Sequence, residues 1–124
     1  MRYMLMICHE GSIRLPGPAS IEDDPRYRLW SEERDRRGVH RGGARLRPAE
    51  DATTVRVREE EEVLLSDGPF AETKEQIAGY DIIECENLDE AIEVASRHPV
   101  ARFGSIEVRP LWEEQSEVRD RRGG

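Results

Sequence analysis

The residue types that could do chemistry gather in one stretch, residues 66–80, which combines acids, a turn and a tyrosine. Its Asp67-Gly68-Pro69 run predicts a tight turn, because Gly68 tolerates a positive φ and Pro69 fixes its own φ. An acid held on such a turn is positioned for proton transfer or for orienting another group, so Asp67 is a candidate catalytic residue. The same carboxylate could instead cap backbone N–H groups of its own turn.

Histidines could exchange a proton with such an acid, because the imidazole pKa lies near neutrality. His9 ends the first predicted strand and His40 begins the second. Each is therefore a candidate catalytic residue, or alternatively a hydrogen-bonded histidine at a sheet edge. His98 follows a predicted helix and precedes Pro99, and we interpret it as a contact at the helix C-terminus.

Four further side chains are candidates for binding a substrate: Lys74, Glu75, Tyr80 and Arg109. Lys74 is flanked by acids, which favours a surface ion pair over a Schiff base. Tyr80 could equally be a core aromatic, and Arg109 could equally be a paired structural arginine. Although His9, Asp67 and Glu75 could be assembled into a metal site, no paired ligand spacing supports one. We therefore expect no metal and no cofactor.

The composition restricts the kinds of partner and the location. The chain has 124 residues, enough for one domain, with 36% hydrophobic and 37% charged residues. Its net charge of −8 argues against a nucleic-acid partner. No apolar run approaches the ~18 residues needed to span a bilayer, and the N-terminus is too strand-like for a signal peptide. Cys8 and Cys85 lack CxxC spacing, so we expect buried reduced thiols and a cytoplasmic protein.

The hydrophobic periodicity predicts six strands and two helices around these residues. The strands are expected at residues 3–9, 39–46, 53–58, 63–65, 78–86 and 105–111. The first helix should start at Asp24-Pro25 and end near Arg37, and the second should start after Asn87 and end at His98-Pro99. The apolar stripe of the first helix is Tyr27, Leu29 and Trp30; that of the second is Leu88, Ala91, Ile92 and Ala95. Residues 10–22 read as a loop, and residues 113–124 as a weakly packed tail with almost no apolar content.

This order of elements is the ferredoxin-like α+β arrangement with an inserted hairpin. Both crossover helices should cover the same face of the sheet. The first strand is nonetheless apolar on both sides, so the helix-free face should also be buried. We therefore expect a homodimer that packs sheet against sheet.

The run Asp67-Gly68-Pro69-Phe70 resembles the signature of the DGPF branch of the YCII-related family. Further similarities lie at residues 1–7, 42–56, 72–80, 88–91 and 106–110. The resemblance implies a dimeric α+β barrel with a cavity between or beside the sheets. The wider family is associated with a His–Asp acid–base pair whose histidine lies on the first helix. Residues 27–30 here contain no histidine, so Asp67 can be carried over as the acid, whereas His9 or His40 would have to substitute for the histidine.

Three hypotheses for function follow. The first is a cofactor-free enzyme that uses acid–base chemistry on a small organic molecule, as in a lyase, isomerase or dehalogenase-like elimination. The second is a non-catalytic module for small-ligand binding or regulation, because the resemblance implies an association with alternative sigma factors. The third is a dimeric scaffold with a filled interior. An enzyme needs a histidine or a second acid within hydrogen-bond reach of Asp67, whereas a binding module needs only a pocket.

Overall fold

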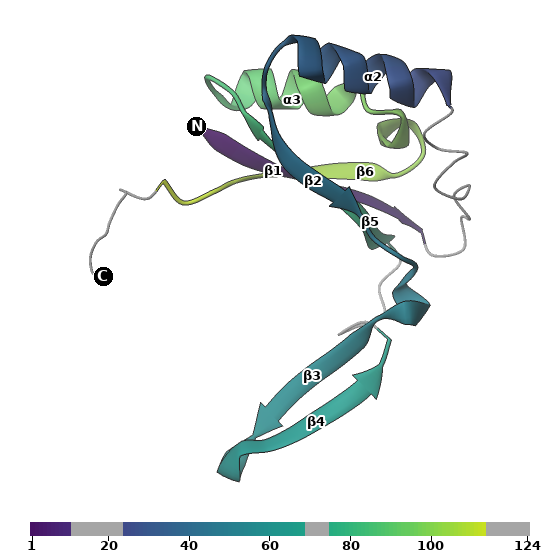
Figure 1. Cartoon of the computed structure of the whole chain (residues 1–124), viewed down its shortest axis with the longest axis vertical. Helices are drawn as coiled ribbons and strands as arrows, with labels where there is room; N and C mark the ends of the chain where they lie inside the picture. Colours follow the sequence, from purple (N-terminus) through teal and green to yellow (C-terminus); the bar gives the residue numbers. More distant parts are fainter. Residues whose placement is uncertain (11–23, 69–74, 114–124) are drawn as a thin grey trace.

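Four antiparallel strands form the main sheet of the protein, in the order β2–β5–β1–β6 (Figure 1). The strands are β1 (Arg2–Glu10), β2 (His40–Arg45), β5 (Glu75–Glu84) and β6 (Ser105–Pro110). This is the strand order of a ferredoxin-like fold, as the sequence predicts. The computed structural model describes residues 1–10, 24–68 and 75–113. Three segments named above lie outside the described residues. They are the predicted loop after Glu10, the segment that holds Pro69, Phe70 and Lys74, and the tail after residue 113.

Two helices cover one face of this sheet (Figure 1), which confirms the predicted arrangement. They are α2 (Pro25–Arg36) and α3 (Leu88–Ser96). The side chain of Asp24 accepts a hydrogen bond from the backbone N–H of Arg26, and Asn87 accepts one from Glu90 N–H. The carboxylate of Glu90 in turn accepts a bond from Glu86 N–H at 2.8 Å. Both helices therefore begin where the capping residues predict. Neither of these two helices, within the part of the chain that is described, is long and apolar enough to cross a bilayer.

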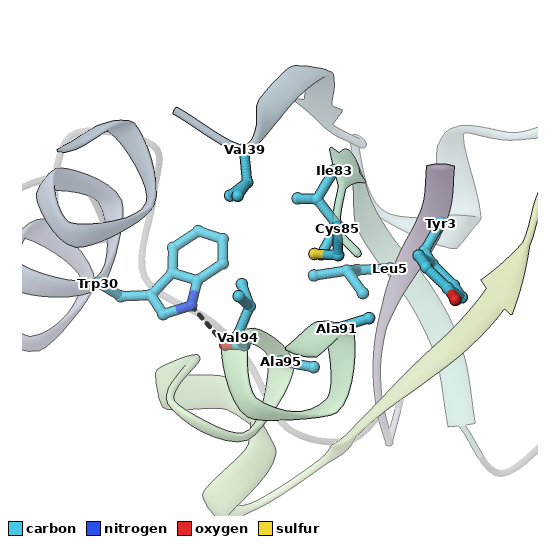
Figure 2. Packing of buried hydrophobic residues seen from close by; sticks show 9 residues of the cluster. All are labelled: Tyr3, Leu5, Trp30, Val39, Ile83, Cys85, Ala91, Val94 and Ala95. Carbon is cyan, nitrogen blue, oxygen red and sulfur yellow. Dashed lines mark hydrogen bonds between the residues drawn. The ribbon is translucent and has the colours of Figure 1, made fainter. Parts of the chain in front are cut away.

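The core lies between the helices and the sheet (Figure 2). Alternate residues of β1 point into it, and Leu5 is fully buried, as is Ile83 of β5. Trp30 of α2 donates a hydrogen bond from Nε1 to the carbonyl oxygen of Val94 in α3 at 2.9 Å, which joins the two helices.

The apolar stripes of the two helices are confirmed in part, because Trp30, Ala91 and Ala95 are buried and three other predicted members are not. Leu29 of α2 is 67% exposed, and Leu88 and Ile92 of α3 are each 48% exposed. The predicted Ala91 and Ala95 are buried, and Val94 completes the face of α3 that packs on the sheet. The small alanines let the helix approach the sheet closely, and this turns the larger Leu88 and Ile92 partly toward solvent.

The inserted hairpin is confirmed and is a separate two-stranded sheet, β3 (Thr53–Arg58) and β4 (Glu62–Asp67), which projects from the main sheet (Figure 1). A 3₁₀ turn at Glu59–Glu61 joins the strands, so the acidic run is a hairpin turn. Two further 3₁₀ turns lie at Ala49–Asp51 (η1) and Pro99–Arg102 (η3).

Some boundaries and burials need correction. β5 begins at Glu75 rather than Ala78, because its first residues pair with the end of β1 after a bulge. Cys85 is buried and unpaired as predicted, whereas Cys8 is unpaired but only partly buried. Cys8 alternates with the core-facing residues of β1, so its side chain lies on the helix-free face.

Candidate functional site

A pocket of about 250 Å³ opens at the edge of the main sheet, where α2, β2, β5 and η3 meet. The ionisable side chains that line it are Arg34, His40, Arg45, Asp81 and His98. Tyr27, Ile7 and Val100 add apolar surface to its walls. A mostly apolar hollow with a few convergent polar groups is the usual form of a small-molecule site.

Asp81 is the acid of this pocket. It lies in β5 two residues before the core residue Ile83, so strand alternation directs its side chain toward the helix-covered face. It is only 8% exposed. Its neighbour across the sheet is Gly43 of β2, where a Cβ atom would lie 2.4 Å from Asp81 Oδ1. The glycine therefore leaves the space that the carboxylate occupies.

Arg34 of α2 holds this carboxylate from the other side. Its Nη1 donates to Asp81 Oδ1 at 3.2 Å, its Nε donates to Asp35 Oδ1 at 3.1 Å, and its Nη2 donates to Ser31 Oγ at 3.3 Å. The guanidinium carbon also lies 5.0 Å from the centre of the Trp30 ring, a cation–π contact. With these partners the guanidinium has one defined orientation, and so does the carboxylate it binds.

His40 stands beside the same carboxylate. Its Nε2 lies 3.3 Å from Asp81 Oδ1, and its Nδ1 lies 4.0 Å from Asp35 Oδ1. Nε2 is buried, and among the described residues none offers it a well-aligned hydrogen bond, so the contact with Asp81 is close but poorly directed. The register between β2 and β5 shifts between His40 and Gly42, and a bulge of this kind re-aims a side chain at a sheet edge.

The pKa of Asp81 depends on its burial and on the charges of these neighbours. Burial raises the pKa of Asp81, and the positive charge of Arg34 and the contact with His40 offset part of that rise. A buried acid between a fixed cation and a histidine is an arrangement common at functional sites.

His98 forms another wall and differs from the prediction. Its backbone N–H does contact the end of α3 at Ala95, but its side chain is buried and caps η3, because Nδ1 accepts a hydrogen bond from Val100 N–H at 3.1 Å. The ring lies edge-on to Trp30, with centroids 4.6 Å apart. Burial, reinforced by the charge of Arg34, lowers the pKa of His98 to about 4.

Two of the predicted site residues, His40 and Tyr80, line this pocket. Tyr80 precedes Asp81 in β5, so alternation places its side chain on the opposite, helix-free face. Asp67, in contrast, is exposed at the end of β4 and does not line the pocket. Asp81 takes this position instead, because it approaches His40 more closely than Asp35 does, at 3.3 Å against 4.0 Å.

The remaining predicted residues lie elsewhere. His9 is near the end of β1 and donates from Nδ1 to the carbonyl oxygen of Glu10 at 2.7 Å. Glu75 accepts a hydrogen bond from Ser105 Oγ at 2.6 Å, at the start of β5. Arg109 pairs with Glu107 on β6, which is the structural pairing considered as its alternative. Lys74 is outside the described residues.

Asp81 and Arg34 are the site residues that the sequence reasoning missed. A signal for Asp81 was present, since it is a single acid inside the apolar strand segment Tyr80–Ile83, where alternation with Ile83 requires it to be buried. Arg34 carries no such signal, because it sits among other charged residues of α2. In the described ranges no three His, Cys, Asp or Glu side chains are grouped as a metal site would require.

Comparison with known proteins places the chain in a family. The model of the YCII-related domain matches residues 1–115, so the chain belongs to the YCII-related family. It is also similar to a protein of Rhizobium meliloti (strain 1021) named "Uncharacterized protein R00369", with 49% identity over 70 residues. That match covers 55% of this chain and 56% of the relative, so the chain spans about half the length of the curated relative it matches.

Proposed function

We propose that the pocket binds a small organic molecule and moves a proton on it, with His40 as the proton carrier and Asp81 as its partner. The observation that carries this proposal is the buried His40 Nε2, 3.3 Å from the Asp81 carboxylate at the wall of the pocket. Asp81 therefore takes the place of Asp67 as the acid of the pair. The chemistry is the acid–base chemistry expected from the sequence, with Asp81 as the acid instead of Asp67.

Each member of the cluster has a distinct part in this proposal. His40 accepts a proton from the bound molecule at Nδ1, and the Asp81 carboxylate beside Nε2 stabilises the imidazolium that forms. Arg34 holds Asp81 in place through the hydrogen bond from Nη1. Abstraction of a proton next to a carbonyl group is the first step of isomerisations and of eliminations that expel a leaving group from the neighbouring carbon. The pair thus suits a lyase, an isomerase or a dehalogenase-like elimination.

The loose alignment of His40 with Asp81 is compatible with this role. Catalytic hydrogen bonds are often long or poorly directed in an empty site and tighten when the substrate is bound.

Exchange of carbon-bound hydrogen for deuterium tests the proposal without knowledge of the product. Small ketones and lactones would be incubated with the protein in D₂O and their α-hydrogens followed by ¹H NMR. We expect exchange that His40→Gln reduces about 100-fold or more, the usual contribution of a positioned acid–base group. Asp81→Asn should also reduce it, with a smaller effect. His9→Gln is the matched control, because His9 lies outside the pocket.

The alternative function, a non-catalytic module for small-ligand binding or regulation, gives a different result in the same experiment. Compounds would then bind to the pocket, and their exchange rate would be the same with wild-type protein and with His40→Gln. That outcome would contradict the acid–base proposal and support the binding module.

We also propose that the protein is a homodimer that buries the helix-free face of the main sheet. Support comes from the apolar strip on that face, where Met4 lies opposite Ile82 and Met6 lies opposite Tyr80. All four side chains are only partly buried within a single chain. A contiguous apolar strip that a single chain leaves only half-buried is typical of an interface.

Light scattering at micromolar concentration tests the dimer. Met6→Glu places a charge in the centre of the strip and should yield monomers. Leu29→Glu, on the exposed side of α2, should leave the mass unchanged. A wild-type protein that is monomeric under these conditions would contradict the proposal.

A further inference from the structure

His98 is a buried polar group of the pocket for which the proposed proton transfer has no role. It is 6% exposed and lines the cavity with Arg34 and His40. Its ring is held by edge-on contacts with Trp30 and with Tyr27, whose centroids are 4.6 and 6.0 Å away. Its orientation is therefore set by the packing of α2 against η3.

The hydrogen bond at Nδ1 determines which ring nitrogen carries the hydrogen. Nδ1 accepts from the backbone N–H of Val100, and an N–H group can only donate. The neutral ring must therefore carry its hydrogen on Nε2. Protonation of Nδ1 would break the cap of η3 and place a second cation beside Arg34, which agrees with the lowered pKa of His98. The side chain is thus neutral at physiological pH.

No hydrogen bond occupies Nε2 within the described part of the chain, and His98 is one of the residues that line the cavity. We propose that His98 Nε2–H is a fixed donor for a ligand oxygen, and that the pocket takes small uncharged carbonyl compounds. The choice of carbonyl compounds rests on the proposed function. His98 holds the carbonyl oxygen while His40 removes a proton from the neighbouring carbon. His98 is then a specificity-determining residue.

The surroundings favour a carbonyl compound over a larger or charged ligand. A cavity of about 250 Å³ holds about eight non-hydrogen atoms, if each takes roughly the space of a water molecule. Ile7 and Val100 supply apolar walls for such a molecule. Arg34 already binds Asp81, Asp35 and Ser31, and Arg45, the other arginine of the lining, also has a partner. A neutral donor polarises a carbonyl oxygen without transferring a proton to it.

The test uses two substitutions that separate the cap from the donor. His98→Asn keeps an acceptor for Val100 N–H, since asparagine is a good capping residue, but has no group at the position of Nε2. In His98→Gln the amide N–H₂ reaches the position of Nε2, but the hydrogen bond that caps η3 is lost. The probes are cyclohexanone and methylenecyclohexane, which have the same shape and differ in the carbonyl oxygen. Binding is measured by NMR titration, and ¹⁵N chemical shifts of the histidine rings report the tautomer.

We expect the Nε2–H tautomer for His98 and millimolar binding of cyclohexanone. His98→Asn should weaken cyclohexanone about tenfold, the value of one hydrogen bond, and His98→Gln should restore most of the affinity. Methylenecyclohexane should bind all three proteins equally. The Nδ1–H tautomer, equal weakening of both probes in His98→Asn, or no binding of cyclohexanone by wild-type protein would each overturn the inference. If His98→Asn does not fold, the tautomer and the His98→Gln titration decide.

Different results would contradict the donor role of His98 and the acid–base function of His40. If cyclohexanone binding depends on His98 while its hydrogen exchange is independent of His40, the acid–base function fails and the donor role stands. If exchange depends on His40 while His98→Asn binds cyclohexanone like wild type, the donor role fails and the function stands.

Discussion

The main sheet and the β3–β4 hairpin are built from similar strand-forming residues, yet their side chains meet different surroundings. In the main sheet Leu5 and Ile83 are fully buried under the helices. In the hairpin the cross-strand pairs Val55–Leu65 and Val57–Val63 lie on one face, which we call the hairpin apolar face. Its four side chains are 58–67% exposed. Strand-forming residue types thus specify both regions, but only the main sheet gains stability from burying them.

The anchoring of the hairpin is local. At its base Gly68 N–H donates to the carbonyl oxygen of Ala52 at 2.7 Å, and Thr54 Oγ donates to the carbonyl oxygen of Gly68 at 2.8 Å. An isolated two-stranded hairpin is marginally stable in water. The main sheet should therefore carry most of the unfolding free energy of the chain, and the hairpin little of it.

Truncation of one leucine in each region should give the largest contrast. Leu5→Ala creates a cavity in the core and should lower the free energy of unfolding by about 3 kcal/mol. Leu65→Ala, on the hairpin apolar face, should lower it by less than about 0.5 kcal/mol. Chemical denaturation measures both. A loss above about 1 kcal/mol for Leu65→Ala would show that this face is covered in solution.

We expect acid to lower the stability of the main sheet and its helices, because they bury the neutral side chain of His98. The unfolded histidine takes up a proton near pH 6.5, whereas folded His98 remains neutral down to about pH 4. Its contribution to stability is therefore complete above pH 6.5 and is lost as the pH falls toward 4, by about 3 kcal/mol. Denaturation curves of wild type and His98→Gln over this range isolate the effect. Parallel pH profiles for the two proteins would contradict the prediction.

The two tryptophans offer a smaller and cleaner contrast. Trp30→Phe removes the hydrogen bond from Nε1 to the carbonyl oxygen of Val94 and should cost about 1–2 kcal/mol. Trp112 is 93% exposed beyond β6, so Trp112→Phe should leave the unfolding free energy unchanged. Equal effects of the two substitutions, measured by urea denaturation, would show that the contact between the helices adds no stability.

The smallest effect is expected at the base of the hairpin. Gly68 has φ of 91°, and no atom of the described residues would obstruct an added Cβ there. Gly68→Ala should cost about 1 kcal/mol through backbone strain alone, and Gly68→Asn should cost less, because asparagine tolerates positive φ better. Amide hydrogen exchange of β3 and β4 should accelerate, while that of β1 stays constant. Faster exchange in β1 would show that the hairpin and the main sheet unfold together.

Local patterns in the sequence were enough for the secondary structure and the fold. Asp24 and Asn87 mark both helix starts, because a cap depends only on the next two or three residues. The order of strands and helices predicted the ferredoxin-like arrangement and the hairpin. The same patterns failed for the burial of Leu29, Leu88 and Ile92, because the angle at which a helix meets the sheet depends on the side chains beneath it.

The candidate site was decided by the tertiary structure. His40 was a candidate from its place at the start of a strand, and Asp67 from its turn, but nothing local relates either of them to Arg34 or Asp81. Arg34 and Asp81 lie 47 positions apart and meet because α2 crosses the sheet edge where β2 pairs with β5. The bulge at His40 and the missing Cβ of Gly43 then set the distance between the histidine and the carboxylate. Strand register and helix packing are non-local, so the sequence by itself determined which residue types were available, and only the fold decided which of them came together.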